Sequence, residues 1–149
     1  MKIPHLRYLI LALLSVVMSA CDKDRLVMPY GMTATINDTP FLATTFYAHK
    51  YINYSHGAII DSSIIIHGSL DTGIGLGIST TAKLSTGMLY SIGGGASGYY
   101  ITNSQYYYYG DGTFRITKIS NTNIQGTFSF KVNSLGINVT DGAFNIDIR

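Results

Sequence analysis

Apolar and polar residues alternate one by one along most of this chain, and this alternation constrains the fold more than any other feature. A period of two residues is that of a β-strand with one buried face, whereas a helix has a period of about 3.6. In the segment MTATIN, for example, Ala34 and Ile36 alternate with Thr33 and Thr35. Glycine, asparagine, aspartate or serine breaks the pattern about every 8 to 12 residues, as turns between antiparallel strands do. Residues 32–149 are therefore predicted to form a single all-β antiparallel domain, a sandwich or a barrel-like fold of about nine or ten short strands.

The alternation also predicts which side chains form the core. Composition agrees with a β domain, because charged residues make up only 12% of the chain, against a usual ~25%, and glutamate is absent. β-branched and aromatic residues, which favour strands, are abundant instead. The predicted core consists of Ile64, Ile66, Ile74, Leu76, Phe114, Ile116, Phe128, Phe130, Phe144 and Ile146.

Two aspartate-containing segments are predicted to be turns. Asp71-Thr72 separates two alternating segments, and Asp111-Gly112 is a typical hairpin sequence. After the first of these turns, Gly73, Gly75 and Gly77 fall on one side of a predicted strand. Because glycine has no side chain, that side is a flat strip against which another strand or an aromatic ring can lie.

The first twenty residues have the layout of a secretory signal peptide. Lys2 and Arg7 precede a largely apolar run, Tyr8–Val17. As a helix this run would be about 15 Å long, half of the ~30 Å hydrocarbon core of a bilayer, so it is too short to span a membrane. Residues 1–20 are therefore predicted to be removed on export, and with them goes the net charge of +2, which leaves the domain neutral.

The chain has a single cysteine, Cys21, directly after the predicted signal peptide. Met18-Ser19-Ala20-Cys21 resembles the lipobox of bacterial lipoproteins, which implies cleavage before Cys21 and acylation of its sulfur. Lipidation explains a lone thiol in an oxidising compartment, where the alternative is a soluble secreted protein with an incidental free cysteine. The acyl chains would hold the protein to the membrane without a transmembrane helix.

The segment that follows, residues 21–31, is short, charged and ends in proline and glycine, as expected for a flexible tether. Its start, Asp22-Lys23-Asp24, resembles the acidic export tags that carry some Bacteroidetes lipoproteins to the cell surface. The prediction is an outer-membrane lipoprotein of the bacterial cell envelope, with surface exposure as a hypothesis.

Four segments of the predicted β domain resemble a family of small Bacteroidetes lipoproteins whose domain has no known function. They are MTATINDTPFLAT near its start, then GTFRIT, IQGTFSFKV and VTDGAFNI toward its end. The resemblance covers most of residues 32–149. It implies a lipoprotein with a β domain and supplies no catalytic residues.

No residue constellation in the chain indicates an enzyme. Asp71-Thr72-Gly73 spells the motif of aspartic proteases, but those enzymes need two such carboxylates, and a turn explains the same letters. His67, Ser69 and Asp71 would lie on one side of a strand, each about 6.6 Å along the strand from the next, so they do not converge as the members of a catalytic triad do. Neither a metal site, a cofactor nor a nucleic-acid partner is predicted. A non-enzymatic interaction or structural module is the leading hypothesis, and a carrier of a small ligand or glycan is the alternative.

The most biased stretch is YYITNSQYYYY, which begins at Tyr99. A two-residue loop at Asn103-Ser104 would pair Tyr99 with Tyr108, Tyr100 with Tyr107 and Ile101 with Tyr106. We predict that the side with Tyr99, Ile101, Tyr106 and Tyr108 enters the core. The other side would then gather Tyr100, Tyr107 and Tyr109 as a surface for a sugar or a protein partner. Ordinary cross-strand aromatic pairing is the alternative.

Overall fold

The computed structural model describes residues 28–149, with the exception of 57 and 109, and the side chains of 53–55 and 58–62 are likewise outside the description. The predicted signal peptide, Cys21 and most of the predicted tether lie outside the described residues. Eleven strands make up most of the described chain. They are β1 (Gly31–Ile36), β2 (Thr39–Leu42), β3 (Thr45–Ser55), β4 (Ala58–Ser69), β5 (Gly75–Thr80), β6 (Leu89–Ile92), β7 (Ala96–Thr102), β8 (Gln105–Tyr108), β9 (Gly110–Ile119), β10 (Asn123–Val132) and β11 (Ile137–Asp147).

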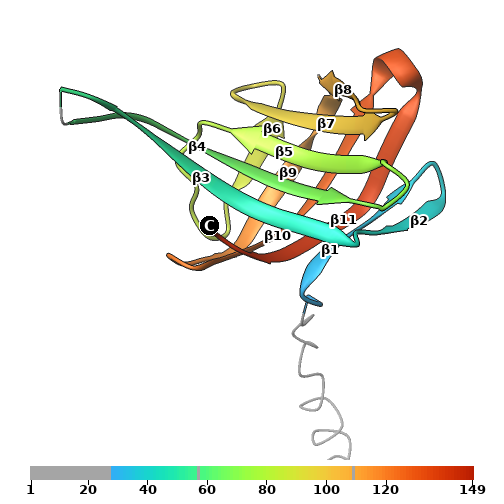
Figure 1. Ribbon diagram of the computed structural model, residues 1–149, viewed down its shortest axis with the longest axis horizontal. Helices are drawn as coiled ribbons and strands as arrows, with labels where there is room; N and C mark the ends of the chain where they lie inside the picture. Colours follow the sequence, from blue (N-terminus) through green and yellow to red (C-terminus); the bar gives the residue numbers. More distant parts are fainter. Residues whose placement is uncertain (1–27, 57, 109) are drawn as a thin grey trace, which may run out of the picture.

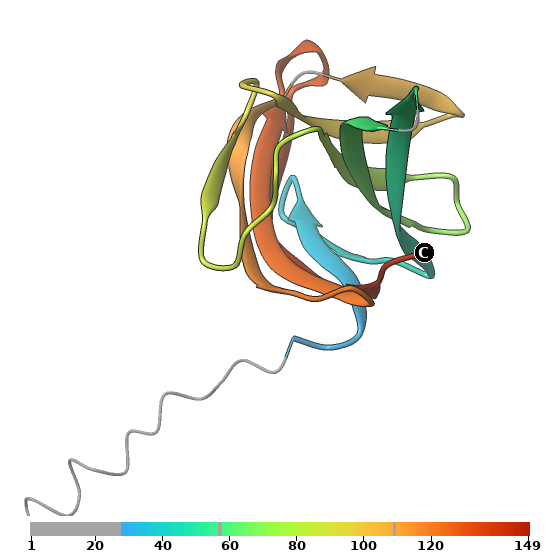
Figure 2. The same cartoon turned by 90° about the vertical axis from the view of Figure 1, so that its left-hand side faces the viewer.

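The strands form two antiparallel sheets that pack face to face (Figures 1 and 2). Sheet A has the strand order β2-β1-β11-β10-β9-β6, and sheet B has the order β3-β4-β5-β7-β8. The predicted all-β fold is confirmed, in its sandwich form, because the sheets stay open and do not close into a barrel. Within the described residues the sole helical segment is one 3₁₀ turn, Asn133–Leu135.

The core lies between the sheets and is built from the residues that the alternation selects. Of the ten predicted core residues, all are buried except Ile74, which is partly buried and packs against the core. Three phenylalanines stack at its centre, with Phe128 between Phe130 and Phe144 at ring-centroid distances of 6.0 and 6.2 Å. The sequence pattern therefore located the buried faces of both sheets.

The two sheets are also joined at one corner by backbone contacts. Ile148 forms a parallel bridge with Ala48, and the Arg149 N–H donates to the Ala48 carbonyl at 2.9 Å. The end of the chain, which leaves β11 of sheet A, thus lies along the edge of β3 of sheet B. This contact links the two sheets at the edge strand β3 and leaves the sandwich otherwise open.

One of the two predicted turns is confirmed and the other is wrong. Asp71 lies in the loop between β4 and β5, where the Leu70 N–H donates to the Ile74 carbonyl at 2.8 Å and the Thr44 hydroxyl donates to the Asp71 carboxylate at 2.7 Å. Asp111 and Gly112 instead lie inside β9, opposite Lys131 and Phe130 of β10. Gly112 is needed there because a Cβ at this position would collide with the backbone of β10.

Candidate functional site

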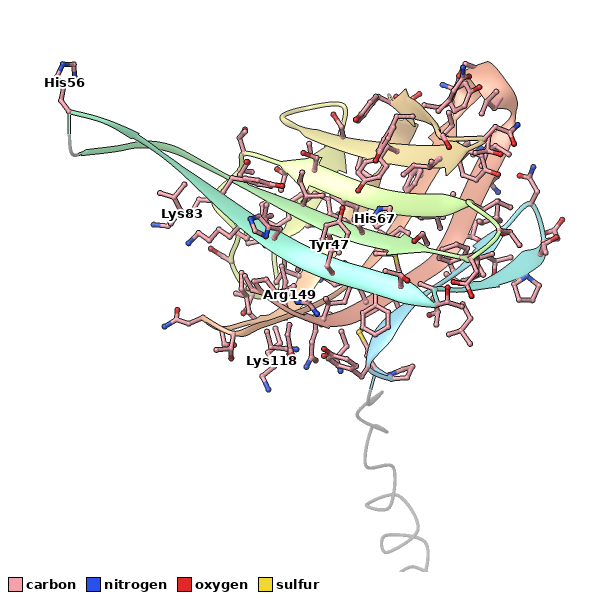
Figure 3. The ribbon with its side chains drawn as sticks, viewed as in Figure 1. Tyr47, His56, His67, Lys83, Lys118 and Arg149 are labelled. Atoms are coloured by element: carbon pink, nitrogen blue, oxygen red, sulfur yellow. The ribbon has the colours of Figure 1, made fainter. Side chains whose placement is uncertain are left out.

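The outer side of sheet B carries an unusual number of aromatic rings. Strand alternation turns one set of side chains inward to the core and the other set, on β3, β4, β7 and β8, outward. We call this surface the aromatic face and define it by seven residues: Tyr47, His49, Tyr51, His67, Tyr99, Tyr106 and Tyr108. Figure 3 shows Tyr47 and His67 side by side on neighbouring strands of this face.

Five residues on the outer side of sheet B lie opposite one another on adjacent strands and form a row that crosses the whole sheet. Tyr47 of β3 pairs with His67 of β4, and His67 pairs with Gly77 of β5. Gly77 in turn pairs with Tyr99 of β7, which pairs with Tyr108 of β8. Directly opposite residues on adjacent strands are close enough for their side chains to touch, so the row is a continuous contact surface.

Gly77 makes room for the ring at the centre of the row. A Cβ at this position would overlap the phenol of Tyr99, which lies across β5. Tyr99 is consequently buried, with only 4% of its surface exposed, although it is on the outer side of the sheet. The prediction that the glycine strip of this strand accepts an aromatic ring is confirmed at this position.

A hydrogen bond fixes the floor of the face. The Tyr99 hydroxyl and His67 Nδ1 are 3.1 Å apart, and both side chains are buried. Burial raises the pKa of Tyr99 strongly, with smaller contributions from the tyrosines around it, and burial also lowers the pKa of His67. The phenol therefore stays protonated and the imidazole neutral, and the two share one hydrogen bond in which the tautomer of His67 decides which group donates.

Tyr106 and Tyr108 form a ridge at the edge of the face. They are the outward residues of the edge strand β8, and they remain 55% and 47% exposed. Their rings stack with centroids 5.8 Å apart and an interplanar angle of 13°, and each ring lies 5.8 Å from Tyr99. Exposed rings held this firmly have little freedom to lose when a ligand binds.

The structure confirms the predicted β7–β8 register but reverses the predicted faces. Tyr99 pairs with Tyr108 and Tyr100 with Tyr107, as expected from a loop at Asn103-Ser104. However, Tyr100 is 8% exposed and belongs to the core, and Tyr107 is partly buried against it. The prediction of Tyr100 and Tyr107 as a binding surface is therefore wrong. The third predicted residue, Tyr109, lies outside the described residues.

The reversal has a physical reason in the neighbouring strands. Tyr100 pairs with Leu76, which is fully buried, whereas Tyr99 pairs with Gly77 on the outer side. The inward side of β7 also carries Gly98, whose α-carbon lies against the ring of Phe130. A single isoleucine, Ile101, suggested the opposite orientation, but the register with β5 decides it.

None of the outward strand residues of sheet B whose side chains the structure describes is charged. Between the rings lie hydroxyl groups, from Ser69 on β4, Ser79 on β5 and Ser97 on β7. In the part of the chain that the structure describes, no three His, Cys, Asp or Glu residues lie close enough to hold a metal ion. The chemistry of this surface is that of neutral rings and hydroxyls.

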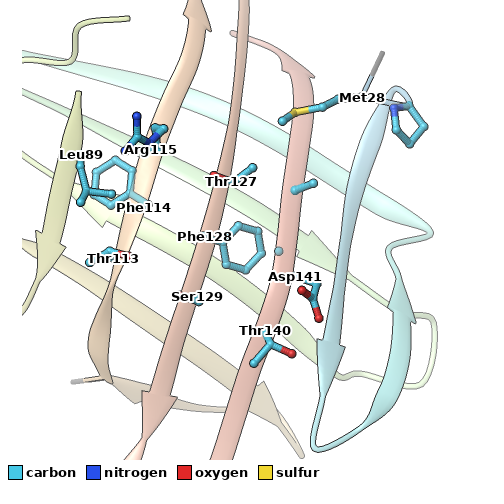
Figure 4. Close-up of a pocket in the computed structure, with 13 residues that line it drawn as sticks. Met28, Leu89, Thr113, Phe114, Arg115, Thr127, Phe128, Ser129, Thr140 and Asp141 are labelled. Carbon is cyan, nitrogen blue, oxygen red and sulfur yellow. The ribbon is translucent and has the colours of Figure 1, made fainter. Parts of the chain in front are cut away.

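A second surface feature lies on the opposite sheet. Residues of β9, β10 and β11, together with Met28, Pro29 and Leu89, line a hollow of about 570 Å³ on sheet A (Figure 4). Its polar lining includes Arg115, Asp141 and threonine hydroxyls. The hollow adjoins the point where the chain enters the domain, because Met28 and Pro29 are among the residues that line it. The Asn145 amide holds this segment against β11 by donating to the Met28 carbonyl at 2.9 Å.

Comparison of the chain with family models, with curated proteins and with solved structures found no match. No helix among residues 28–149, as far as they are described, is long and apolar enough to cross a membrane.

Proposed function

We propose that this chain is a lipid-anchored lipoprotein of the bacterial cell envelope, held in the outer membrane by acyl chains on Cys21, whose β-sandwich is a non-enzymatic interaction module. The lipobox-like sequence Met18-Ser19-Ala20-Cys21 supports the anchor, and the resemblance to small Bacteroidetes lipoproteins agrees with it. Display on the cell surface is part of the proposal and rests on Asp22-Lys23-Asp24.

The aromatic face is the observation that carries the interaction role. Tyrosine is enriched at binding surfaces because it offers a rigid apolar ring together with a polar hydroxyl. The face also lies on sheet B, whereas the chain enters the domain along sheet A, where Tyr30 donates to Asp147 of β11 at 3.0 Å. A domain tethered through sheet A therefore has the aromatic face free to meet a partner.

Packing of the interior favours an interaction module over a carrier of a small ligand. The centre of the space between the sheets is filled by large side chains, and Phe114, Phe130 and Phe144 are each no more than 2% exposed. A hollow of about 460 Å³ does lie between the sheets beside the edge strand β3, where Lys50 and Ile64 of sheet B and Ile119 of sheet A line it. A carrier that encloses its ligand in the core would need a cavity of several hundred Å³ at this centre.

The anchor is tested by a Cys21→Ser variant in cells supplied with labelled palmitate. We expect the wild-type protein to incorporate the label and to sediment with membranes, and the variant to do neither. Label in the Cys21→Ser protein would refute the assignment of Cys21.

The face is tested by placing a photo-crosslinking amino acid at Tyr106 and, as a control, at Leu42. Both side chains are exposed, at 55% and 68%, but Leu42 lies on edge strand β2 of sheet A. In intact cells we expect a discrete crosslinked product from position 106 and none from position 42. Equal products from both positions, or none from 106, would contradict an interaction through this face.

A further inference from the structure

We propose that the aromatic face binds a neutral polysaccharide, with the sugar chain lying across the strands from β3 to β8. This inference rests on the proposed function, since it names the partner of the same surface. The sugar chain would lie along a row of opposite residues that continues over every strand of sheet B, namely Tyr47, His67, Gly77, Tyr99 and Tyr108.

The dimensions of the row suit a chain of sugars. Adjacent strands lie about 4.8 Å apart, so the four steps from β3 to β8 span about 19 Å, which exceeds the size of a single sugar ring. At one end of this span the stacked pair Tyr106 and Tyr108 on β8 is exposed, and at the other end Tyr47 on β3 is partly exposed. A further exposed ring, Tyr51, lies four residues along β3 from Tyr47, on the same side of the sheet. The apolar face of a pyranose packs on such rings as other flat apolar groups do.

Polar groups between the rings match the hydroxyls of a sugar. Tyr47, Tyr106 and Tyr108 each carry a phenol hydroxyl that no described residue engages in a hydrogen bond. Nε2 of His67, the ring nitrogen that does not contact Tyr99, is a further polar group at the floor of the face. Hydroxyl and imidazole groups can both donate to sugar hydroxyls, and the phenols can also accept from them.

The lack of charge on the face separates a neutral glycan from other occupants. A nucleic acid or an acidic polysaccharide would require lysine or arginine, and the described strand residues of this side have neither. A second copy of the chain would bury the same phenols against each other, and the aliphatic residues available for an apolar interface, Ile65 and Ile101, are already partly buried within the sheet.

The floor of the face is preorganised, which favours a weakly interacting and flexible ligand. Tyr99 is held by Gly77 below it and by the hydrogen bond to His67, and its ring stacks on the imidazole at a centroid distance of 6.0 Å. Because these groups are fixed before binding, little of the binding free energy is spent on ordering the protein.

The test uses the mature lipidated protein, which begins at Cys21, in detergent and affinity gel electrophoresis with soluble polysaccharides. The neutral probes are β-glucan, xyloglucan, galactomannan, arabinoxylan and yeast mannan, and the acidic probes are polygalacturonate and chondroitin sulfate. We expect retardation by at least one neutral probe and by neither acidic probe.

Matched variants connect any binding to the aromatic face. Tyr106→Ala and Tyr108→Ala should each weaken binding roughly threefold to tenfold, the range expected for the loss of one aromatic stacking contact. Tyr106→Phe keeps the ring and should retain most of the affinity. Tyr30→Ala removes a ring of similar exposure from outside the face and should leave binding unchanged.

The outcomes separate this inference from the proposed function. If no neutral probe binds, or if binding survives both alanine substitutions in protein that unfolds like wild type, the glycan inference is wrong. A crosslinked protein from position 106 together with no glycan binding would overturn the inference and leave the interaction module standing. A crosslinked second copy of the chain would overturn it in the same way.

Discussion

Substitution of Gly77 by alanine tests the central feature of the aromatic face, the close contact between β5 and the ring of Tyr99. The new Cβ would overlap the Tyr99 phenol and would lie 2.6 Å from the Ile66 carbonyl oxygen. The Ile66 oxygen belongs to the backbone of β4 and has little room to move, so the ring of Tyr99 must swing outward. That movement breaks the hydrogen bond between the Tyr99 hydroxyl and His67.

The expected cost follows from these two effects. Inserting a methyl group into a packed site typically costs about 1–3 kcal/mol. Loss of one buried hydrogen bond adds about 0.5–1.5 kcal/mol. We therefore expect Gly77→Ala to lower the free energy of unfolding by about 2–4 kcal/mol, which is a large part of the ~5–15 kcal/mol of a typical domain.

Urea unfolding followed by tyrosine fluorescence measures this loss, because the chain has no tryptophan to mask the tyrosine signal. For an unfolding slope of about 1–3 kcal/mol per molar urea, the midpoint should fall by roughly 1–2 M. Gly94→Ala is the matched control, since a Cβ at Gly94 meets no atom within 4 Å. Its free energy of unfolding should stay within about 1 kcal/mol of wild type.

A double-mutant cycle assigns the loss to the ring. Leucine at position 99 lacks the distal atoms that a Cβ at Gly77 would meet. In a Tyr99→Leu background, Gly77→Ala should therefore cost about 1–2 kcal/mol less than in wild type, the remainder being the contact with Ile66. If Gly77→Ala leaves stability unchanged, or if its cost is the same in both backgrounds, the packing of Tyr99 on β5 is refuted.

Three further predictions concern the core, the buried histidine and the loop aspartate. Phe130→Ala should lower the free energy of unfolding in urea by about 3–5 kcal/mol. Ser129 is the outward neighbour of Phe130 on β10, and Ser129→Ala should change this free energy by less than about 0.5 kcal/mol. Similar losses for both variants would show that the faces of β10 are assigned wrongly. Burial lowers the pKa of His67, so the unfolded chain takes up a proton near pH 6.5 while the folded protein does not. The urea midpoint of the wild-type protein should therefore fall as the pH decreases from about 7.5 to 5. In the His67→Gln variant the midpoint should fall less steeply over the same pH range. Asp71→Asn should change the free energy of unfolding by less than about 1 kcal/mol, because the exposed Asp71 accepts one hydrogen bond, from Thr44. If the protein had a peptidase activity that Asp71→Asn abolished, the assignment of Asp71 as a loop residue without a catalytic role would be wrong.

The sequence predicts the fold well because the buried faces of the sandwich keep a period of two residues along most of their length, with β-bulges as the exceptions. Ile64 and Ile66 on β4, and Phe128 and Phe130 on β10, alternate with polar residues, so the sequence identifies their inward sides directly. Strand pairing is harder to predict where a turn sequence is misleading. Asp111-Gly112 has the composition of a hairpin, yet the glycine serves the close approach of β9 to β10.

At the candidate site the sequence predicts which residues of β7 and β8 pair, but not which side of the two strands faces the solvent. The register of the β7–β8 hairpin follows from its two-residue loop, in which Asn103 and Ser104 both have a positive φ. The direction of each face does not follow from the hairpin, because tyrosine occupies both sides and is compatible with core and surface alike. A more distant contact decides it, namely the pairing of Tyr99 with Gly77 and of Tyr100 with Leu76. The glycine strip and the tyrosine run were each visible in the sequence, but only their pairing relates them.

The two sheets of this protein provide an internal comparison that supports a ligand for the aromatic face. The outward positions of β9 and β10 on sheet A carry Arg115, Thr127, Ser129 and Lys131, the hydrophilic residues that a strand needs to face water. The outward positions of sheet B meet the same solvent and obey the same alternation, yet seven of them carry tyrosine or histidine, with serine, glycine and isoleucine between.

Solvation alone does not account for this difference, because exposed phenol rings add apolar surface that serine or lysine would avoid. Core packing does not require it either, since Tyr106 and Tyr108 point away from the core and stay about half exposed. Their contacts are with each other and with Tyr99, so they hold one another in place on the surface. Rings that are fixed, exposed and without charge are what a neutral, partly apolar ligand requires, and this contrast between the sheets is the strongest reason to look for one.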